Sequence, residues 1–178
     1  MTQILVAYGT TEGHTGTIAA FVADVLREQG HEVTVADVEA LETIPDTCGA
    51  VILAGSVHVG KHDAQVVDFA AANRELLTSR SSAFVSVSLA LVGDTAEAQK
   101  YVQDFAATSG WSPEQVSLVA GALLYTQYGF AKRQLMRGIA ASKRGALITD
   151  TSQDHVYTDW DAVRRFAEGF AAQVAAAA

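Results

Sequence analysis

Five short apolar runs alternate with segments of helical periodicity along the entire chain. Several runs are apolar at consecutive positions, as in Val51-Ile52-Leu53-Ala54. A strand that is apolar on both faces has to be covered by helices on both sides, which is typical of a parallel sheet. The expected strands span residues 3–8, 32–37, 50–56, 83–88 and 116–121. The alternation therefore predicts a doubly wound α/β fold with a five-stranded parallel sheet and helices on both faces.

Helical periodicity predicts helices over residues 14–29, 64–77 and 95–108, and a further helix closes the chain. Thr158 followed by Asp161 is an acidic variant of the capping box that starts such a helix. Val163, Phe170 and Val174 then recur on one face. We expect this face of the closing helix to pack against the sheet.

Size and composition favour one compact domain over residues 1–178. The chain is 49% hydrophobic and has no linker rich in Pro or Ser, so it should bury about 70% of its unfolded surface. No apolar run approaches the ~18 residues of a spanning helix, and no signal peptide precedes the first strand, so we expect a cytoplasmic protein. Cys48 is the only cysteine, which excludes an internal disulfide and a thiolate metal cluster. We expect no metal site, and any redox chemistry requires a bound cofactor.

The charge of the chain is unevenly distributed. The formal net charge is -8 at pH 7, which argues against nucleic-acid binding, because neutralising phosphates requires clustered cations. Residues 115–149 nevertheless contain no Asp or Glu. The cations in this window are Lys132, Arg133, Arg137, Lys143 and Arg144. They predict a local positive field on an otherwise acidic protein.

Residues 124–157, which we call the insertion, are not needed by a minimal five-stranded domain. They separate the fifth strand from the closing helix, and connections of this length are usually functional in compact domains. Phe130, Leu135, Met136 and Ile139 recur at near-helical spacing, so part of the insertion should form an amphipathic helix. We expect substrate or partner recognition here.

The first strand leads through a loop, residues 9–15, directly into a helix. A helix N-terminus offers unpaired N–H groups and the positive end of its dipole, and Thr10, Thr11 and Thr15 add hydroxyl donors. This arrangement suits a phosphate monoester. A P-loop would require a lysine after its last glycine, and a Rossmann fingerprint would require GxGxxG, neither of which is present. The alternative is a Thr-rich helix cap with no ligand.

Two further loops are expected at the same edge, because ligands of doubly wound sheets bind beyond the carboxyl ends of the strands. Small residues after the third and fourth strands would let the backbone approach a planar ring. Together the three loops would enclose flavin mononucleotide (FMN). The predicted cofactor-binding residues are Thr10, Thr11, Glu12, Gly13, His14, Thr15, Ser56, Val57, His58, Val59, Gly60, Ser88, Leu89, Ala90 and Leu91.

Five stretches along the chain are more specific than the general strand pattern. They are Ser56-Val57-His58-Val59-Gly60, Ser82-Ala83-Phe84-Val85-Ser86-Val87, Trp111-Ser112-Pro113, Ala120-Gly121-Ala122-Leu123 with Tyr125, and Val156-Tyr157-Thr158-Asp159-Trp160. These stretches resemble the menaquinone-dependent protoporphyrinogen IX dehydrogenases, a branch of the flavodoxin superfamily. The resemblance implies a sheet in the order 2-1-3-4-5 and bound FMN. It also implies oxidation of protoporphyrinogen IX to protoporphyrin IX in haem biosynthesis, with a quinone as electron acceptor.

Two histidines flank Gly60 near the expected flavin ring. His58 or His62 could move a proton during dehydrogenation, and the alternative for each is an exposed loop histidine without a chemical role. Two histidines four residues apart, without a third ligand, make an incomplete zinc site.

The insertion holds the candidates for substrate contact. Tyr125, Tyr128 and Tyr157 could stack on a tetrapyrrole, and the alternative for each is a plug of the core. Arg133 and Arg137, one helical turn apart, could bind the propionates of the tetrapyrrole. Alternatively, the cations face anionic lipid and give peripheral membrane contact through residues 128–144, on the inner face of the cell membrane. A solvated basic face is the third alternative.

The sequence thus leaves three functional hypotheses. The leading one is an FMN-dependent protoporphyrinogen IX dehydrogenase that uses a quinone. The second is a flavodoxin-type electron carrier that docks to a redox partner protein, and the third is an NAD(P)H-dependent FMN quinone reductase. The insertion favours the first over the second, because a carrier does not need a basic segment of about thirty residues.

Overall fold

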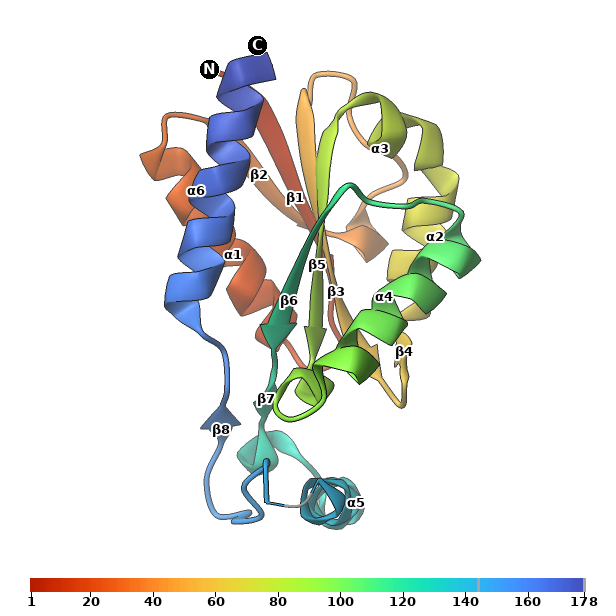
Figure 1. Ribbon diagram of the computed structural model, residues 1–178, viewed down its shortest axis with the longest axis vertical. Coiled ribbons are helices and arrows are strands. Elements are labelled where there is room, and N and C mark those ends of the chain that lie inside the picture. The colour runs from red at the N-terminus through yellow and green to blue at the C-terminus, as the bar shows by residue number, and fades with distance from the viewer. Residues whose placement is uncertain (144, 178) are drawn as a thin grey trace.

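The computed structural model describes residues 1–143 and 145–177. Its long strands are parallel and lie in the order β2-β1-β3-β5-β6, with the short strand β4 antiparallel to β3 (Figure 1). The strands are β1 (Gln3–Gly9), β2 (Glu32–Asp37), β3 (Ala50–His58), β4 (Lys61–His62), β5 (Ser81–Ser88) and β6 (Gln115–Ala120). Since β5 and β6 are the fourth and fifth long strands, the predicted fold class and the order 2-1-3-4-5 are confirmed.

Strand β3 extends beyond its predicted end because it continues into a hairpin with β4. Val59 and Gly60 form the turn between the paired residues His58 and Lys61, and their φ angles are 48° and 76°. Two successive positive φ angles are typical of a type I′ turn. The left-handed conformation is costly for a β-branched residue, so Val59 carries backbone strain at the edge of the sheet.

Helices cover both faces of the sheet, as predicted (Figure 1). One face carries α1 (His14–Glu28) and α6 (Trp160–Ala177). The other face carries α2 (Ala64–Ala72), α3 (Arg74–Ser79) and α4 (Thr95–Ser109).

The single helix predicted over residues 64–77 is in fact two helices. Asn73 lies between them and is 2% exposed. Its side-chain oxygen accepts hydrogen bonds from Thr43 Oγ1 at 2.8 Å and from Ile44 N at 2.9 Å, and its amide donates to Phe69 O at 2.9 Å. The hydrogen bonds of Asn73 to residues distant in the sequence therefore divide the helix, although the helical periodicity of residues 64–77 is continuous.

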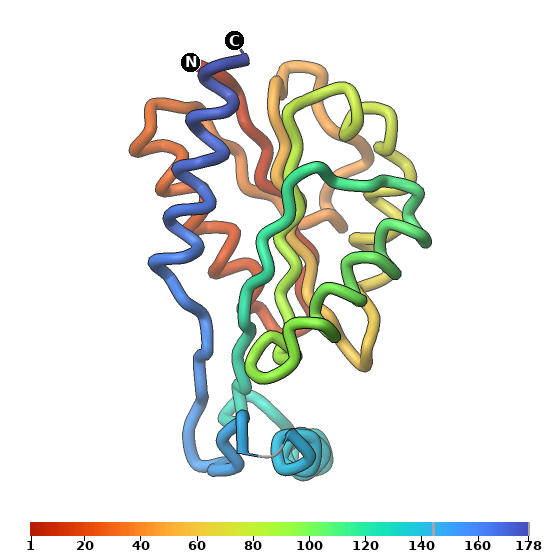
Figure 2. The backbone as a smooth tube through the Cα atoms, in the orientation of Figure 1, coloured from red at the N-terminus to blue at the C-terminus, as the bar shows by residue number. Residues whose placement is uncertain are grey.

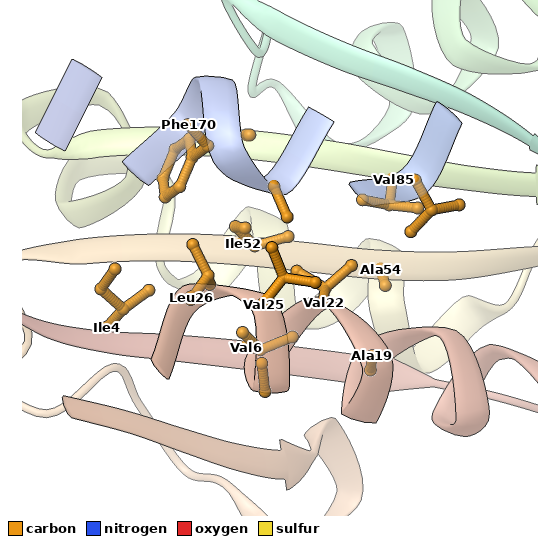
Figure 3. Close-up of a cluster of buried hydrophobic side chains, with 14 of the residues drawn as sticks. Ile4, Val6, Ala19, Val22, Val25, Leu26, Ile52, Ala54, Val85 and Phe170 are labelled. Carbon is orange, nitrogen blue, oxygen red and sulfur yellow. The ribbon is translucent and has the colours of Figure 1, made fainter. Parts of the chain in front are cut away.

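The two faces of the sheet have separate hydrophobic cores, because alternate residues of a strand point to opposite sides. In β1, Ile4 and Val6 pack with α1 and α6, whereas Leu5 and Ala7 pack on the side of α2. Figure 3 shows the first core, in which side chains of α1 and α6 meet those of β1, β3 and β5. These four residues of β1 are each at most 1% exposed, which agrees with the two-sided burial expected of a central parallel strand.

Two glycines let α2 approach the carboxyl edge of the sheet. Gly9 ends β1 and is in register with Gly55 of β3. A Cβ atom on Gly9 would overlap Val66 Cγ2 of α2, and one on Gly55 would lie 3.0 Å from Val66 Cγ1. Val66 is fully buried, and its branched side chain has one preferred rotamer in a helix. The missing side chains therefore set how closely α2 packs on the loop after β1.

The closing helix α6 is capped by a different residue than predicted. Asp159 Oδ1 accepts a hydrogen bond from Ala162 N at 2.9 Å. Thr158 Oγ1 instead donates to Ala120 O at 2.7 Å, at the end of β6. The capping prediction for Thr158 is wrong because its hydroxyl is used in this contact between distant segments. The apolar face of α6 is buried as predicted.

The insertion forms a separate layer beyond the carboxyl edge of the sheet (Figure 2). It contains the 3-10 turn η3 (Tyr125–Gln127) and α5 (Phe130–Ser142), and the strands β7 (Ala122–Leu123) and β8 (His155–Val156) pair antiparallel at its two ends. Its own small core includes Leu124, Tyr125 and Leu147. The helix predicted within the insertion is therefore confirmed.

Much of the apolar stripe of α5 is exposed to solvent. Phe130, Leu135 and Ile139 are 79%, 63% and 40% exposed, and the buried residue of the helix is Ala140. Within the described residues, none of the helices combines the length and the apolar character needed to cross a bilayer.

Gly9→Ala is expected to lower the free energy of unfolding by about 1–3 kcal/mol, because the new methyl group forces Val66 to move in a packed core. In the Val66→Ala background the same change should cost much less. Urea denaturation of the four proteins of this cycle measures the coupling.

Gly169→Ala in α6 is the control for this cycle. Apart from the neighbouring backbone of α6 itself, no described atom lies within 4 Å of a Cβ atom at Gly169, so this change should be neutral or stabilising. Equal costs of Gly9→Ala in both backgrounds would contradict the close contact with Val66.

Candidate functional site

A cleft opens at the carboxyl edge of the sheet, between the loops that follow β1, β3 and β5 and the insertion. It contains about 500 Å³ of empty space, part of it open to solvent. Its lining residues are Thr10, Thr11, Glu12, His14, Thr15, Ser56, Val57, His58, Val87, Ser88, Leu89, Gly121, Ala122, Tyr128 and Met136. The loops meet here because the parallel strands of a doubly wound sheet end at one edge.

The loop between β1 and α1 presents an uncapped helix N-terminus to the cleft. Gly13 is the N-cap residue, with a φ angle of 90°, and as a glycine it has no side chain that could cap α1. Gly13 N donates to Thr10 Oγ1 at 2.8 Å, which fixes the loop over the start of the helix. The N–H groups of the first turn, at His14, Thr15 and Gly16, are therefore available to an anion.

His14 is held as a neutral donor beside this loop. Its Nε2 atom lies 2.7 Å from Thr158 Oγ1, and that hydroxyl donates its only proton to Ala120 O. His14 Nε2–H must therefore be the donor to Thr158. Burial lowers the pKa of His14 below its usual value, and the positive end of α1 disfavours the imidazolium further. An anion bound at this loop would therefore meet backbone dipoles and hydroxyl groups rather than a cation.

The loops after β3 and β5 line the cleft with small and apolar residues, among them Val57, Ser88 and Leu89. The Ser56 hydroxyl oxygen is buried and has no hydrogen-bond partner among the described residues. An unpaired buried hydroxyl costs free energy, so Ser56 fits a ligand that brings a hydrogen-bonding group into the cleft. Together the residues fit a phosphate ester joined to a planar ring.

The structure brings most of the predicted cofactor-binding residues to this cleft. Those that line it are Thr10, Thr11, Glu12, His14, Thr15, Ser56, Val57, His58, Ser88 and Leu89. His58 is an exposed residue of this lining, and its role in proton transfer stays a prediction.

Gly13, Val59, Gly60, Ala90 and Leu91 are not part of the lining. Gly13 contributes its backbone at the helix start, and Val59 and Gly60 form the hairpin turn beyond the cleft. Ala90 and Leu91 belong to the short 3-10 helix η2 (Leu89–Leu91), in which Ala90 is buried. Because the 3-10 helix begins at Leu89, directly after β5, the backbone turns and the side chains of Ala90 and Leu91 do not continue along the strand into the cleft.

Five lining residues were not among the predicted cofactor-binding residues: Val87, Gly121, Ala122, Tyr128 and Met136. Gly121 is the last residue of the predicted fifth strand and Ala122 follows it, so the rule that ligands bind at strand ends was the signal for them. Tyr128 and Met136 come from the insertion, and no local pattern indicates that the insertion passes over the cleft.

The insertion is attached to the phosphate loop through Glu12. Glu12 Oε2 accepts a hydrogen bond from Tyr128 OH at 2.5 Å, and Glu12 Oε1 lies 2.7 Å from Lys132 Nζ. Lys132 Nζ also lies 4.8 Å from the centre of the Tyr128 ring. Burial raises the pKa of Tyr128 above its usual value, and the hydrogen bond to Glu12 raises it further, so the phenol is a protonated donor. We call Glu12, Tyr128 and Lys132 the Glu12 cluster.

Two cations of the insertion, Lys132 and Lys143, are ion-paired rather than part of a solvated basic face. Besides Lys132, which is paired with Glu12, Lys143 is paired with Glu97 of α4 at 2.5 Å. Arg144 lies outside the described residues. The two ion pairs tie the insertion to the sheet domain at separate places.

The two candidate propionate ligands, Arg133 and Arg137, have different surroundings. Arg133 donates to the backbone oxygens of Tyr125 and Tyr128 at 3.1 and 3.2 Å, so its guanidinium braces the turn before α5. Arg137 is exposed. The prediction that Tyr125 stacks on a substrate is wrong: the residue is 0% exposed, and its hydroxyl donates to Ile148 O at 3.2 Å.

His62 belongs to the core rather than to the cleft. It is 7% exposed, and its ring centre lies 5.1 Å from that of Phe84 and 5.3 Å from that of Phe105. Its Nε2 atom lies 2.9 Å from Ser86 Oγ. Burial lowers the pKa of His62 to about 4, so the ring is neutral and structural. No group of His, Cys, Asp and Glu in the described part of the chain could hold a metal ion.

Comparisons with known proteins place this geometry in a family. Residues 5–150 match the family model of the flavodoxin domain. A protoporphyrinogen IX dehydrogenase (quinone) of Leishmania major is 35% identical over 96% of this chain and 75% of its own length. The enzyme of the same name from Escherichia coli K12 is 31% identical over 95% of this chain and 94% of its own length. This chain belongs to the flavodoxin-domain family, in the protoporphyrinogen IX dehydrogenase branch.

Solved flavodoxin structures share the fold at low sequence identity. A short-chain flavodoxin associated with a bacterial microcompartment has a TM-score of 0.57 at 15% identity, over 98% of this chain and 99% of its own. The Fusobacterium nucleatum flavodoxin bound to flavin mononucleotide has a TM-score of 0.53 at 12% identity, over 99% of both chains. At these identities the likeness supports the flavodoxin fold alone.

The buried ring of His62 should make this flavodoxin-like protein less stable in acid. The pKa of His62 is about 4 in the folded protein and near 6.5 in the unfolded chain. At a pH between these two values, the unfolded chain binds a proton at His62 that the folded protein does not bind. The contribution of His62 to the free energy of unfolding should therefore fall by up to about 3 kcal/mol as the pH falls from 7 to 4. Burial of His14 contributes in the same direction. Urea denaturation at several pH values measures the slope.

His62→Gln should flatten this slope, whatever its own effect on stability at pH 7. His58→Gln is the control, because it removes an exposed histidine from the same hairpin and should leave the slope unchanged. If the free energy of unfolding depends on pH as steeply in His62→Gln as in the wild type, the pKa of His62 does not differ between the folded and unfolded protein.

Proposed function

We propose that the protein is an FMN-dependent protoporphyrinogen IX dehydrogenase that transfers the electrons to a quinone. The observation that carries the proposal is the wall that the insertion adds to the cleft through Tyr128 and Met136. An electron carrier does not need such a wall, whereas an enzyme that binds a second, large ligand beside its cofactor does. Relatives that are 31% and 35% identical over nearly the whole chain carry this enzyme name.

When bound, FMN supplies the redox chemistry between tetrapyrrole and quinone. The residues of this chain would bind the cofactor and the substrate and orient them toward each other. The first turn of α1, with Thr10 and Thr15, would hold the phosphate, and the Ser56 hydroxyl would bond to a polar edge of the ring. Leu89 and Met136 would exclude water from the ring and the substrate. The raised pKa of Tyr128 keeps its hydroxyl protonated in this cleft.

The first experiment follows colour and porphyrin formation. The purified protein should contain FMN or bind it when it is added. Anaerobic incubation with protoporphyrinogen IX and a menaquinone analogue should then produce protoporphyrin fluorescence faster than autoxidation. FMN binding without porphyrin formation would favour the electron carrier, and failure to bind any flavin would contradict the proposed cofactor.

We further propose that Arg137, rather than Arg133, binds a propionate of the substrate. Arg137→Glu should raise KM for protoporphyrinogen IX about tenfold with little change in Tm, because an exposed cation is replaced by a charge of the same sign as the propionate. Arg133→Glu should instead lower Tm, since it removes two hydrogen bonds to the backbone. Steady-state kinetics and thermal unfolding measure both. An unchanged KM in Arg137→Glu would rule out the propionate contact.

We also propose that the exposed apolar side of α5 contacts the membrane, where a quinone is dissolved. Phe130 and Leu135 are large, mostly exposed, and close in sequence to Lys132 and Arg137. An amphipathic helix with apolar residues and cations of this kind can lie in the interface of an anionic bilayer. This would be a peripheral contact.

Phe130→Ser combined with Leu135→Ser should reduce binding to vesicles that contain anionic lipid, measured by co-sedimentation. Burial of each side chain is worth roughly 1.5–3 kcal/mol, so a loss of tenfold or more is expected. Val116→Ser is the matched control, because it removes an exposed apolar side chain from β6. Equal vesicle binding by the wild type and the double variant would contradict the proposed contact.

A further inference from the structure

The charge that lines the cleft has the wrong sign for a phosphate site. Among the described lining residues there is no lysine or arginine, and Glu12 is the one acid. Glu12 lies in the loop between Thr10 and Thr15, whose hydroxyls and helix N–H groups would receive the phosphate. A carboxylate beside a phosphate ester repels it, and the repulsion grows where water is excluded. An anion site with this lining needs a group that compensates for Glu12.

The insertion supplies that group. Lys132 Nζ is 2.7 Å from Glu12 Oε1, and Tyr128 OH donates to Glu12 Oε2 at 2.5 Å. Both carboxylate oxygens are thus engaged from the side of the insertion. The side chains of Glu12 and Lys132 are 20% and 37% exposed, so water screens the pair only in part.

We propose that Lys132 is a positioning residue for the phosphate of the cofactor: it neutralises Glu12 and holds the carboxylate toward the insertion, so that the loop accepts an anion. The inference rests on the proposed binding of FMN. It gives the insertion a role in cofactor affinity besides forming a wall of the cleft. It also predicts that Lys132 matters for a flavin with a phosphate and not for one without it.

The second ion pair of the insertion provides a matched control. Lys143 and Glu97 are 2.5 Å apart and similarly exposed, and they also join the insertion to the sheet domain. Neither residue lines the cleft. If Lys132 only tethered the insertion, removing Lys143 would have the same consequence.

The test measures the Kd of the flavin-free protein for FMN and for riboflavin, which lacks the phosphate, from the quenching of flavin fluorescence. Lys132→Met should weaken FMN binding about tenfold or more and leave riboflavin binding within about twofold. Lys143→Met should change neither, and Lys132→Arg should retain FMN binding. The FMN defect of Lys132→Met should shrink as salt is raised from about 20 mM to about 0.5 M.

Glu12→Gln completes a cycle that isolates the charge. This variant should bind FMN at least as tightly as the wild type, and adding Lys132→Met to it should cause no further loss. Rescue in the double variant would also show that Lys132→Met had not simply unfolded the insertion.

Several outcomes would overturn the role of Lys132. They are unchanged FMN affinity in Lys132→Met, an equal loss of FMN and riboflavin, or an equal FMN loss in Lys143→Met. These results leave the proposed function intact. If the wild type binds no FMN, both proposals fail. If it binds FMN without oxidising protoporphyrinogen IX, the proposed enzyme activity alone fails.

Discussion

The parallel pairing of β1 between β2 and β3 is the constraint on which the rest of the structure depends. It buries Ile4, Leu5, Val6 and Ala7 between two layers of helices, and each parallel connection must return over one face of the sheet. The start of α1 and the ends of β3 and β5 therefore meet at one edge. Small residues at that edge, such as Gly9 and Gly55, let helices and loops approach closely. The cleft is thus a consequence of the strand order.

The insertion adds a second layer at this edge. It has its own small core around Tyr125 and Leu147, and ion pairs at Glu12 and Glu97 attach it to the sheet domain. The insertion contributes Tyr128 and Met136 to the lining of the cleft, and it exposes the apolar side of α5 to solvent. The Glu12 cluster connects both features to the phosphate loop.

The sequence predicted the sheet and the loop after β1 well, because both depend on local patterns. Consecutive apolar residues indicate a strand buried on two faces, and a Thr-rich turn before a helix indicates an anion site. The break at Asn73 could not be predicted, because it depends on Thr43 and Ile44, which are distant in sequence. The burial of Tyr125 and the bracing by Arg133 also depend on the path of the insertion, which no periodicity encodes. The spacing correctly put Arg133 and Arg137 on one helix, but it could not show that Lys132 is paired with Glu12 or that Arg133 is hydrogen-bonded to the backbone.

A crystal structure of the protein with FMN would show directly whether the cleft is the cofactor site. We expect the phosphate within hydrogen-bonding distance of the Thr10 hydroxyl and of the N–H groups at the start of α1. We expect the ring near Ser56 and Leu89, with Lys132 still paired to Glu12. A phosphate bound elsewhere, for example at Arg137, or a flavin outside the cleft, would contradict this placement.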